Sequence, residues 1–313
     1  MSLPAGIDIS KEKLDIYIGG SFAQIKNNAQ AIKAFFKKEA KDSQIVMEAT
    51  GKYHRLAHQL LEEMGFQVMI VNPYQSKNFA KAMNLLCKTD KVDAKMLSQF
   101  AERMDFKPTL CLKEDQQKML DLSRHLDDLK KLKVELEGRK RESKGFIDKS
   151  LESTVDVVKE QIKKTKEELD AVIQDNESLQ ENVALLMSIP GVGLSTATSL
   201  LSYLRELGTA NKREIAALSG LAPMNNESGT FKGKRRIRGG RQDVRSHLYM
   251  PVLGAATQYN KRLNVFYEKL VQSGKPKKVA LTACMRKLLV WANCIIASGQ
   301  PWNANHEEKG LTA

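Results

Sequence analysis

The middle of the chain carries two apolar heptad seams, and these constrain the fold more than any other feature. The first seam runs from Met119 to Leu136 at intervals of 3, 4, 3 and 7 residues. The second runs from Leu151 to Val172 at intervals of 4, 3, 4, 7 and 3 residues. Lys and Glu residues flank both seams. This spacing predicts two long helices that pack along a coiled-coil seam.

Two glycines, Gly138 and Gly145, lie between the seams, and we expect them to bend the chain into a hairpin. The seams can pair within one chain or with a second copy, and a dimer is the favoured interpretation. The 313-residue chain has room for two or three domains. We therefore expect three parts: a first domain over 1–108, a helical arm over 109–182 and a C-terminal domain over 183–313.

The first part alternates between short apolar runs and helical spacing. Its predicted strands are 3–9, 14–19, 22–26, 44–47 and 66–71, and its predicted helices are 29–40, 53–64, 74–86 and 91–104. A meander of three strands followed by alternating helices and strands is typical of an α/β domain with a mixed sheet.

The last part is predicted to be mainly helical. Helices are expected at 183–187, 195–204, 243–258, 260–272 and 276–298, with a polar loop over 224–240. The turn Pro190-Gly191-Val192-Gly193 opens the second of these helices and resembles a helix-hairpin-helix element, which holds a phosphate through backbone amides and a helix N-terminus. Gly191 and Gly193 are therefore candidate nucleic-acid-binding residues. The alternative is a simple glycine-rich connection.

The excess positive charge is localised. The chain has 50 Lys+Arg and 37 Asp+Glu, a net of +13, and residues 201–300 alone hold 18 and 5, which is also +13. Seven cations lie within fourteen residues against one acid, Asp243: Lys232, Lys234, Arg235, Arg236, Arg238, Arg241 and Arg245. These side chains would repel one another without a polyanion, so DNA or RNA is the expected partner.

Four acidic residues in the first part form a candidate metal site. Asp8 and Glu48 end apolar strands, where an ionised carboxylate is costly unless it is paired or bound to a cation. Asp90 and Asp93 are three residues apart, which places both on one face of a helix. Together they can hold two Mg²⁺ ions for phosphodiester chemistry. Singly, each is explained as a turn, capping or helix-start residue.

Other features limit the location and the chemistry. No apolar stretch approaches the ~20 residues that span a bilayer, and the N-terminus has no signal-peptide pattern, so a cytoplasmic protein without a membrane partner is expected. The four cysteines form no zinc-type spacing and indicate a reduced compartment. His54 and His58 have a metal-compatible spacing, but no third ligand is evident.

Several motifs together resemble a known family. Gly6-Ile7-Asp8-Ile9-Ser10, Met47-Glu48-Ala49-Thr50-Gly51 and Thr89-Asp90-Lys91-Val92-Asp93-Ala94 are similar to the acidic tetrad of the DEDD insertion-sequence transposases. This IS one-ten family has a RuvC-like domain and includes the Piv-type DNA invertases. Ser188–Gly193, Leu218–Pro223, Ser228-Gly229, Gly239–Arg241 and Arg245–Met250 are similar, in order, to its C-terminal transposase domain.

The resemblance implies a fold and a mechanism. The fold would be an RNase H-like α/β domain, a helical arm and a mainly helical serine transposase domain. Asp8, Glu48, Asp90 and Asp93 would be metal ligands, and Ser228 would attack the DNA backbone to form a phosphoserine intermediate. Members form composite sites in homo-oligomers, here a bacterial dimer or tetramer, and a structured RNA of the element guides them to donor and target DNA.

The residues around Ser228 are compatible with this role but do not establish it. Ser228 lies in a polar loop just before the basic run, whose cations would acidify a hydroxyl and neutralise a phosphorane. The simpler explanation is a turn serine, and Ser246 and Tyr249 are rival nucleophiles nearby. Two other functions stay open: a RuvC-like junction nuclease that uses water, and a non-enzymatic nucleic-acid-binding assembly protein.

Overall fold

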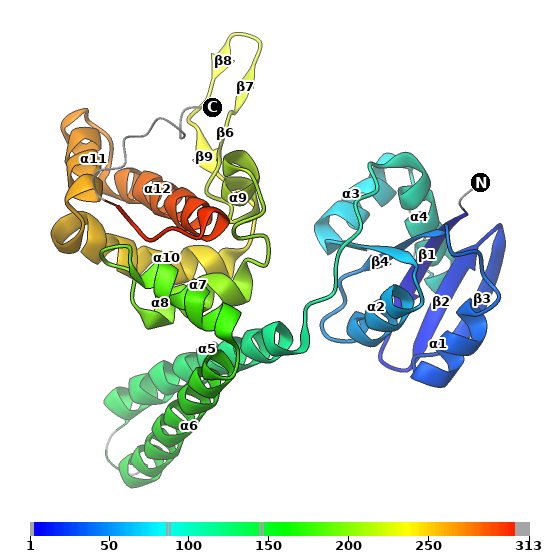
Figure 1. The fold of residues 1–313 in the computed structure, drawn as a ribbon, viewed down its shortest axis with the longest axis horizontal. Coiled ribbons are helices and arrows are strands. Elements are labelled where there is room, and N and C mark those ends of the chain that lie inside the picture. Colours follow the sequence, from blue (N-terminus) through cyan, green and yellow to red (C-terminus); the bar gives the residue numbers. More distant parts are fainter. Residues whose placement is uncertain (1–2, 86, 88, 144, 146, 304–313) are drawn as a thin grey trace. The chain divides into compact units, whose positions relative to one another are not determined.

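The computed structural model describes residues 3–85, 87, 89–143, 145 and 147–303. The chain divides into two compact units, residues 1–111 and 112–313 (Figure 1). We call them the first and second units.

A five-stranded mixed sheet forms the centre of the first unit, as the alternation of strands and helices predicts. Its order is β3-β2-β1-β4-β5. The leading hairpin strands β1, β2 and β3 pair antiparallel, whereas β4 and β5 extend the sheet in parallel from β1. The strand bounds are β1 Pro4–Ile9, β2 Lys13–Ile18, β3 Ser21–Lys26, β4 Gln44–Glu48 and β5 Gln67–Val71.

Helices cover both faces of this sheet. One face packs against α1 (Ala29–Phe36) and α2 (His54–Glu63), and its core includes Ile7, Ile45 and Phe36. The other face packs against α4 (Asp90–Arg103), beside the preceding α3 (Pro73–Ala82), and its core includes Val46 and Leu97. Successive side chains along β1 and β4 therefore point to opposite faces of the sheet and belong to different cores.

The heptad seams form an antiparallel pair of helices within the chain (Figure 1). α5 spans Glu114–Glu142 and α6 spans Asp148–Gln174. Leu136 of α5 is buried with Val155 and Val158 of α6, so the seams cover each other in one chain rather than requiring a second copy. Gly138 does not bend the chain, because it stays inside α5. The reversal comes later, where Gly145 adopts a positive φ of 92°.

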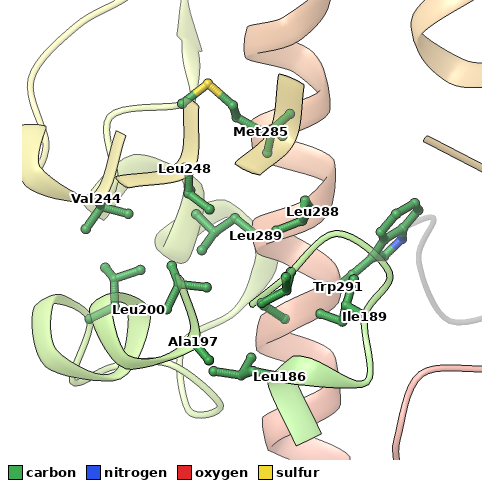
Figure 2. Close-up of a cluster of buried hydrophobic side chains, with 14 of the residues drawn as sticks. Leu186, Ile189, Ala197, Leu200, Val244, Leu248, Met285, Leu288, Leu289 and Trp291 are labelled. Carbon is green, nitrogen blue, oxygen red and sulfur yellow. The ribbon is translucent and has the colours of Figure 1, made fainter. Parts of the chain in front are cut away.

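The rest of the second unit is a helical domain built around α12 (Figure 2). Leu288 and Leu289 of α12 pack among side chains from the other helices, including Leu186, Leu200 and Leu248. The helices are α7 Glu177–Met187, α8 Leu194–Tyr203, α9 Lys212–Leu218, α10 Gln242–Gly254, a π-helical turn Ala255–Tyr259, α11 Lys261–Gln272 and α12 Lys277–Ser298.

α12 is more apolar than the sequence pattern suggested. Among the described helices it alone is long and apolar enough to cross a membrane, which corrects the expectation that no stretch approaches that length. After Lys278, the only charged residues of α12 are Arg286 and Lys287. α12 contacts α7, α9, α10 and α11, so its apolar surface forms the core of the unit.

Residues 224–240 are not an unstructured loop. β6 (Pro223–Met224) pairs with β9 (Arg236–Ile237), and β7 (Glu227–Ser228) pairs with β8 (Phe231–Lys232). These pairs form a narrow hairpin that extends from the helices of the second unit (Figure 1). We call residues 223–238 the basic hairpin. Each strand is only two residues long, too short to show the apolar alternation by which strands are predicted.

Candidate active site

The sheet register aligns three carboxylates on adjacent strands. Asp8 of β1 is directly opposite Asp15 of β2. On the other side of β1, Ile7 is opposite Met47, so Asp8 and Glu48 are the next residues in register. Side chains at paired positions share one face of a sheet. Asp15, Asp8 and Glu48 therefore form a row across β2, β1 and β4.

α4 packs on the same face as this row. Gly6 lies two residues before Asp8, and a Cβ at Gly6 would come within 2.1 Å of the carbonyl oxygen of Ala94 in α4. Ser98 Oγ also donates to the carbonyl oxygen of Pro4 at 2.9 Å. The absence of a side chain at Gly6 therefore allows α4 to lie directly on β1.

The N-terminus of α4 brings the other two predicted carboxylates to the row. Thr89 is its N-cap, and Thr89 Oγ1 accepts from the Val92 amide at 3.3 Å. Asp90 and Asp93 both lie in the first turn. The N-cap is therefore Thr89 rather than Asp90, and the cap leaves both aspartates available to the site.

Electrostatics show that these carboxylates interact. Burial, together with the negative charges of Asp93, Asp90 and Asp15, raises the pKa of Asp8 to about 6 against the opposing hydrogen bond from the Ile9 amide. Like charges gathered at a partly desolvated position favour a proton or a cation. Asp93, Asp90 and Asp15 thus act electrostatically on Asp8, while Glu48 is placed beside Asp8 by the register of β1 and β4.

Three further residues belong to this site and were not predicted. Asp15 is buried and accepts from Gln24 Nε2 at 2.6 Å. Lys13 Nζ donates to Asp90 Oδ2 at 2.5 Å and lies 3.4 Å from Asp15 Oδ2. Ser76 of α3 donates to Glu48 Oε2 at 2.7 Å. The tight β1–β2 hairpin was the available signal for Asp15, because its symmetric register places residue 15 opposite residue 8.

The donor set fits divalent cations. Carboxylate oxygens are the ligands that Mg²⁺ and similar hard ions prefer. Asp8, Glu48, Asp90 and Asp93 bring several carboxylates to one face, and burial and the charges of Asp93 and Asp90 raise the pKa of Asp8. Lys13 supplies one positive charge to Asp90.

Ser228 lies in the second unit, at the exposed tip of the basic hairpin. It ends β7 and is opposite Phe231 of β8. Its neighbour Glu227 lies 4.0 Å from Arg235 Nη2. Ser228 is thus an exposed residue of a hairpin that also carries exposed cationic residues.

The predicted basic residues divide into two groups. Lys234, Arg235, Arg236 and Arg238 are exposed on the basic hairpin, whereas the side chain of Lys232 lies outside the described residues. Arg241 donates to both oxygens of Glu206, at 2.5 and 2.7 Å. Burial raises the pKa of Glu206, but these bonds outweigh it and hold the pKa at about 2.

Arg245 is also engaged within the second unit. Its Nη1 donates to the carbonyl oxygens of Ser219, at 3.0 Å, and Gly239, at 2.6 Å. Arg241 thus bonds to the segment after α8, and Arg245 bonds to the C-terminal end of α9 and to the segment that follows the basic hairpin.

The two glycines of the predicted phosphate turn have different surroundings. A Cβ on Gly191, whose φ is 93°, would lie 2.5 Å from the Cβ of Ala255. Gly191 is therefore required by the turn and by close packing on the π-helical turn. Gly193 is exposed and is the N-cap of α8.

Comparison with known families identifies both units. The DEDD-type IS110 transposase model matches residues 5–142, which include all four predicted ligands. The model described as Transposase IS116/IS110/IS902 family matches residues 183–268, which include Ser228 and the basic hairpin. The chain carries the two domains of an IS110-family transposase. This is the IS one-ten family that the motifs resemble.

Curated relatives agree with this assignment. The chain is 26% identical over 269 residues to the pilin gene-inverting proteins of Moraxella bovis and Moraxella lacunata, covering 84% of this chain and 83% of each relative. The protein is therefore an enzyme, a DNA recombinase of the transposase class. The DEDD domain implies an RNase H-like fold, which agrees with the five-stranded mixed sheet, and domains of this kind generally use divalent metal ions.

Proposed function

We propose that this IS110-family transposase cleaves and rejoins DNA through a phosphoserine intermediate on Ser228, with Mg²⁺ held by Asp8, Glu48, Asp90 and Asp93. The observation that carries the proposal is the convergence of these carboxylates around Asp8, whose pKa burial and neighbouring charges raise to about 6. A site of this kind suits two cations, which when bound would supply Lewis acidity at a scissile phosphate.

Different residues of the chain have different roles in the proposed reaction. The hydroxyl oxygen of Ser228 bonds to phosphorus, the 3′ or 5′ oxygen of the cleaved strand leaves with a proton, and the reverse attack by a strand end releases Ser228 and rejoins the DNA. Arg235, Arg236 and Arg238 of the basic hairpin offer positive charge to the phosphate oxygens. Lys13 and Ser76 position Asp90 and Glu48.

The proposal extends to partners by resemblance to the family. A structured RNA of the element would guide the protein to donor and target DNA by base pairing, so the protein itself would read little sequence. The active form would be a cytoplasmic homo-oligomer, a dimer or tetramer. The exposed cations of the basic hairpin, together with Gly193 at the N-terminus of α8, support backbone contacts to either nucleic acid.

A recombination assay tests the proposal against its two alternatives. Wild type, Asp8→Asn and Ser228→Ala are compared for DNA binding, strand cleavage and joined product, with Mg²⁺ and the RNA transcribed from the element. We expect both variants to bind DNA and to form no joined product. Cleavage that survives in Ser228→Ala would identify a junction nuclease that uses water. If the Asp8→Asn variant still formed joined product, Asp8 would not be required for the reaction, which would contradict the proposed metal site.

Removing cations from the basic hairpin is expected to weaken DNA binding in a salt-dependent way. Each lost phosphate contact lowers the slope of log K against log salt by about 0.9 for duplex DNA. The double variant Arg236→Gln/Arg238→Gln should therefore lower the slope by about 2, as measured by fluorescence anisotropy between low and moderate salt. The control is Lys163→Gln, an exposed cation on α6. An equal loss in both would indicate only a non-specific charge effect.

A further inference from the structure

A second cluster of metal-ligating side chains lies in the first unit, apart from the acidic row. His58 and Glu62 are four residues apart on α2, and Cys111 lies in the segment that follows α4. One ligand atom from each, a ring nitrogen, a carboxylate oxygen and the thiol sulfur, lies within 4.8 Å of the others. The sequence indicates His58 only through its spacing from His54, and it does not indicate this set of ligands, because Cys111 is 49 residues beyond Glu62.

We infer that His58, Glu62 and Cys111 form a zinc site. Nitrogen, oxygen and sulfur donors together are typical of Zn²⁺, whereas Mg²⁺ selects oxygen alone. Bonds of roughly 2.0–2.3 Å in a tetrahedron separate ligand atoms by roughly 3.5 Å, so small side-chain adjustments close the site. His58 is buried, while Glu62 and Cys111 are half-buried. Three protein ligands would leave the fourth tetrahedral position of the zinc to a water molecule.

The hydrogen bonds around the cluster match the outer shell of a metal site. His58 Nε2 lies 2.6 Å from the carbonyl oxygen of Thr109, and metal-binding histidines commonly donate one ring N–H to such a carbonyl. Glu62 Oε2 accepts from the Cys111 amide at 2.8 Å, so the carboxylate is also oriented.

The position of the cluster indicates what the metal does. Thr109 hydrogen-bonds to the edge strand β5, through its amide to Val68 O at 2.7 Å and through Oγ1 from the Ile70 amide at 3.1 Å. Residues 109–111 thus connect β5 to α2, just before the chain enters α5. Bound zinc would hold this segment against α2 and fix the position at which the chain leaves the first unit.

Cobalt spectroscopy on the full-length protein tests the inference. Metal-free protein in excess Mg²⁺, which occupies hard carboxylate sites, is titrated with Co²⁺. We expect one equivalent to give a thiolate-to-cobalt charge-transfer band in the near ultraviolet, and Zn²⁺ to abolish it. Cys111→Ser should lose the band, and Glu62→Gln should weaken Co²⁺ binding at least about tenfold. The matched control Cys87→Ser, at an exposed cysteine, should keep it.

Circular dichroism of each metal-free variant establishes that it is folded before it is titrated. No charge-transfer band in wild type would overturn the inference. A band that persists in Cys111→Ser and falls in Cys87→Ser would show adventitious binding to the exposed thiol and would overturn it equally. Zn²⁺ should also slow alkylation of Cys111 in wild type, and unchanged alkylation would contradict coordination by its sulfur.

Discussion

Asp8→Asn is expected to stabilise the metal-free protein while abolishing DNA cleavage. At neutral pH the wild-type carboxylate is ionised in a place where burial and the charges of Asp93, Asp90 and Asp15 disfavour it. A pKa about two units above the usual value corresponds to roughly 3 kcal/mol, and solvent screening reduces this to about 1–2 kcal/mol. The amide removes that cost, so the free energy of unfolding rises by this amount.

The pH dependence follows from the direction of the shift. The folded-state pKa of Asp8 is about 6, above the ordinary value of 3.8. The ionised carboxylate therefore lowers the free energy of unfolding by its full amount only above pH 6. As the pH falls from 6 to about 3.8, the native carboxyl takes up its proton and the advantage of Asp8→Asn disappears. Denaturant unfolding at several pH values measures this. Mg²⁺ should stabilise wild type and not the variant; equal stabilisation of both would place the cation elsewhere.

Gly6→Ala is expected to disrupt the first unit severely. The added Cβ would meet the Ala94 carbonyl oxygen at 2.1 Å and the Ser98 amide nitrogen at 2.2 Å, both backbone atoms of α4. α4 would have to move off β1, which removes packing around Leu97 and carries Asp90 and Asp93 away from Asp8. Overpacking of this kind costs roughly 1–3 kcal/mol, and more where the neighbour is backbone.

Unfolding of purified Gly6→Ala, with DNA cleavage as a second readout, measures this effect. Gly65→Ala is a useful control, because Gly65 lies in the same unit, where an added Cβ would meet nothing within 4 Å, but has a positive φ of 86°. It should lose stability through backbone strain and keep cleavage. Gly6→Ala should lose both. Wild-type cleavage by Gly6→Ala would show that α4 does not set the geometry of the carboxylates.

Much of the first unit was predictable from local pattern. The apolar runs of β1 and β4 end at Asp8 and Glu48, and Thr89 begins the helix that carries Asp90 and Asp93, so each proposed ligand occupies a position that its neighbours define. Asp15 and Lys13 were missed because their role depends on strand register rather than on their own surroundings in the sequence.

The second unit was less predictable, for two physical reasons. The strands of the basic hairpin are only two residues long, too short to show a hydrophobic period. Arg241 and Arg245 look like nucleic-acid contacts in the sequence, but acceptors distant in the chain, Glu206 and Ser219, engage their guanidinium groups. Gly138 was expected to bend the arm, yet a single glycine costs a packed helix only about 1 kcal/mol, which the seam offsets.

The most direct test of the recombinase mechanism is a search for a covalent protein–DNA adduct at Ser228. Wild type and Ser228→Ala are incubated with end-labelled element DNA, Mg²⁺ and the RNA of the element, and separated on a denaturing gel. Ser246→Ala is the matched control, because Ser246 is also an exposed serine, in the helix α10 that follows the basic hairpin in the chain. The proposed mechanism predicts a labelled adduct in wild type and Ser246→Ala, with the phosphate mapped to Ser228, and none in Ser228→Ala. Cleavage without an adduct, unchanged in Ser228→Ala, would contradict it.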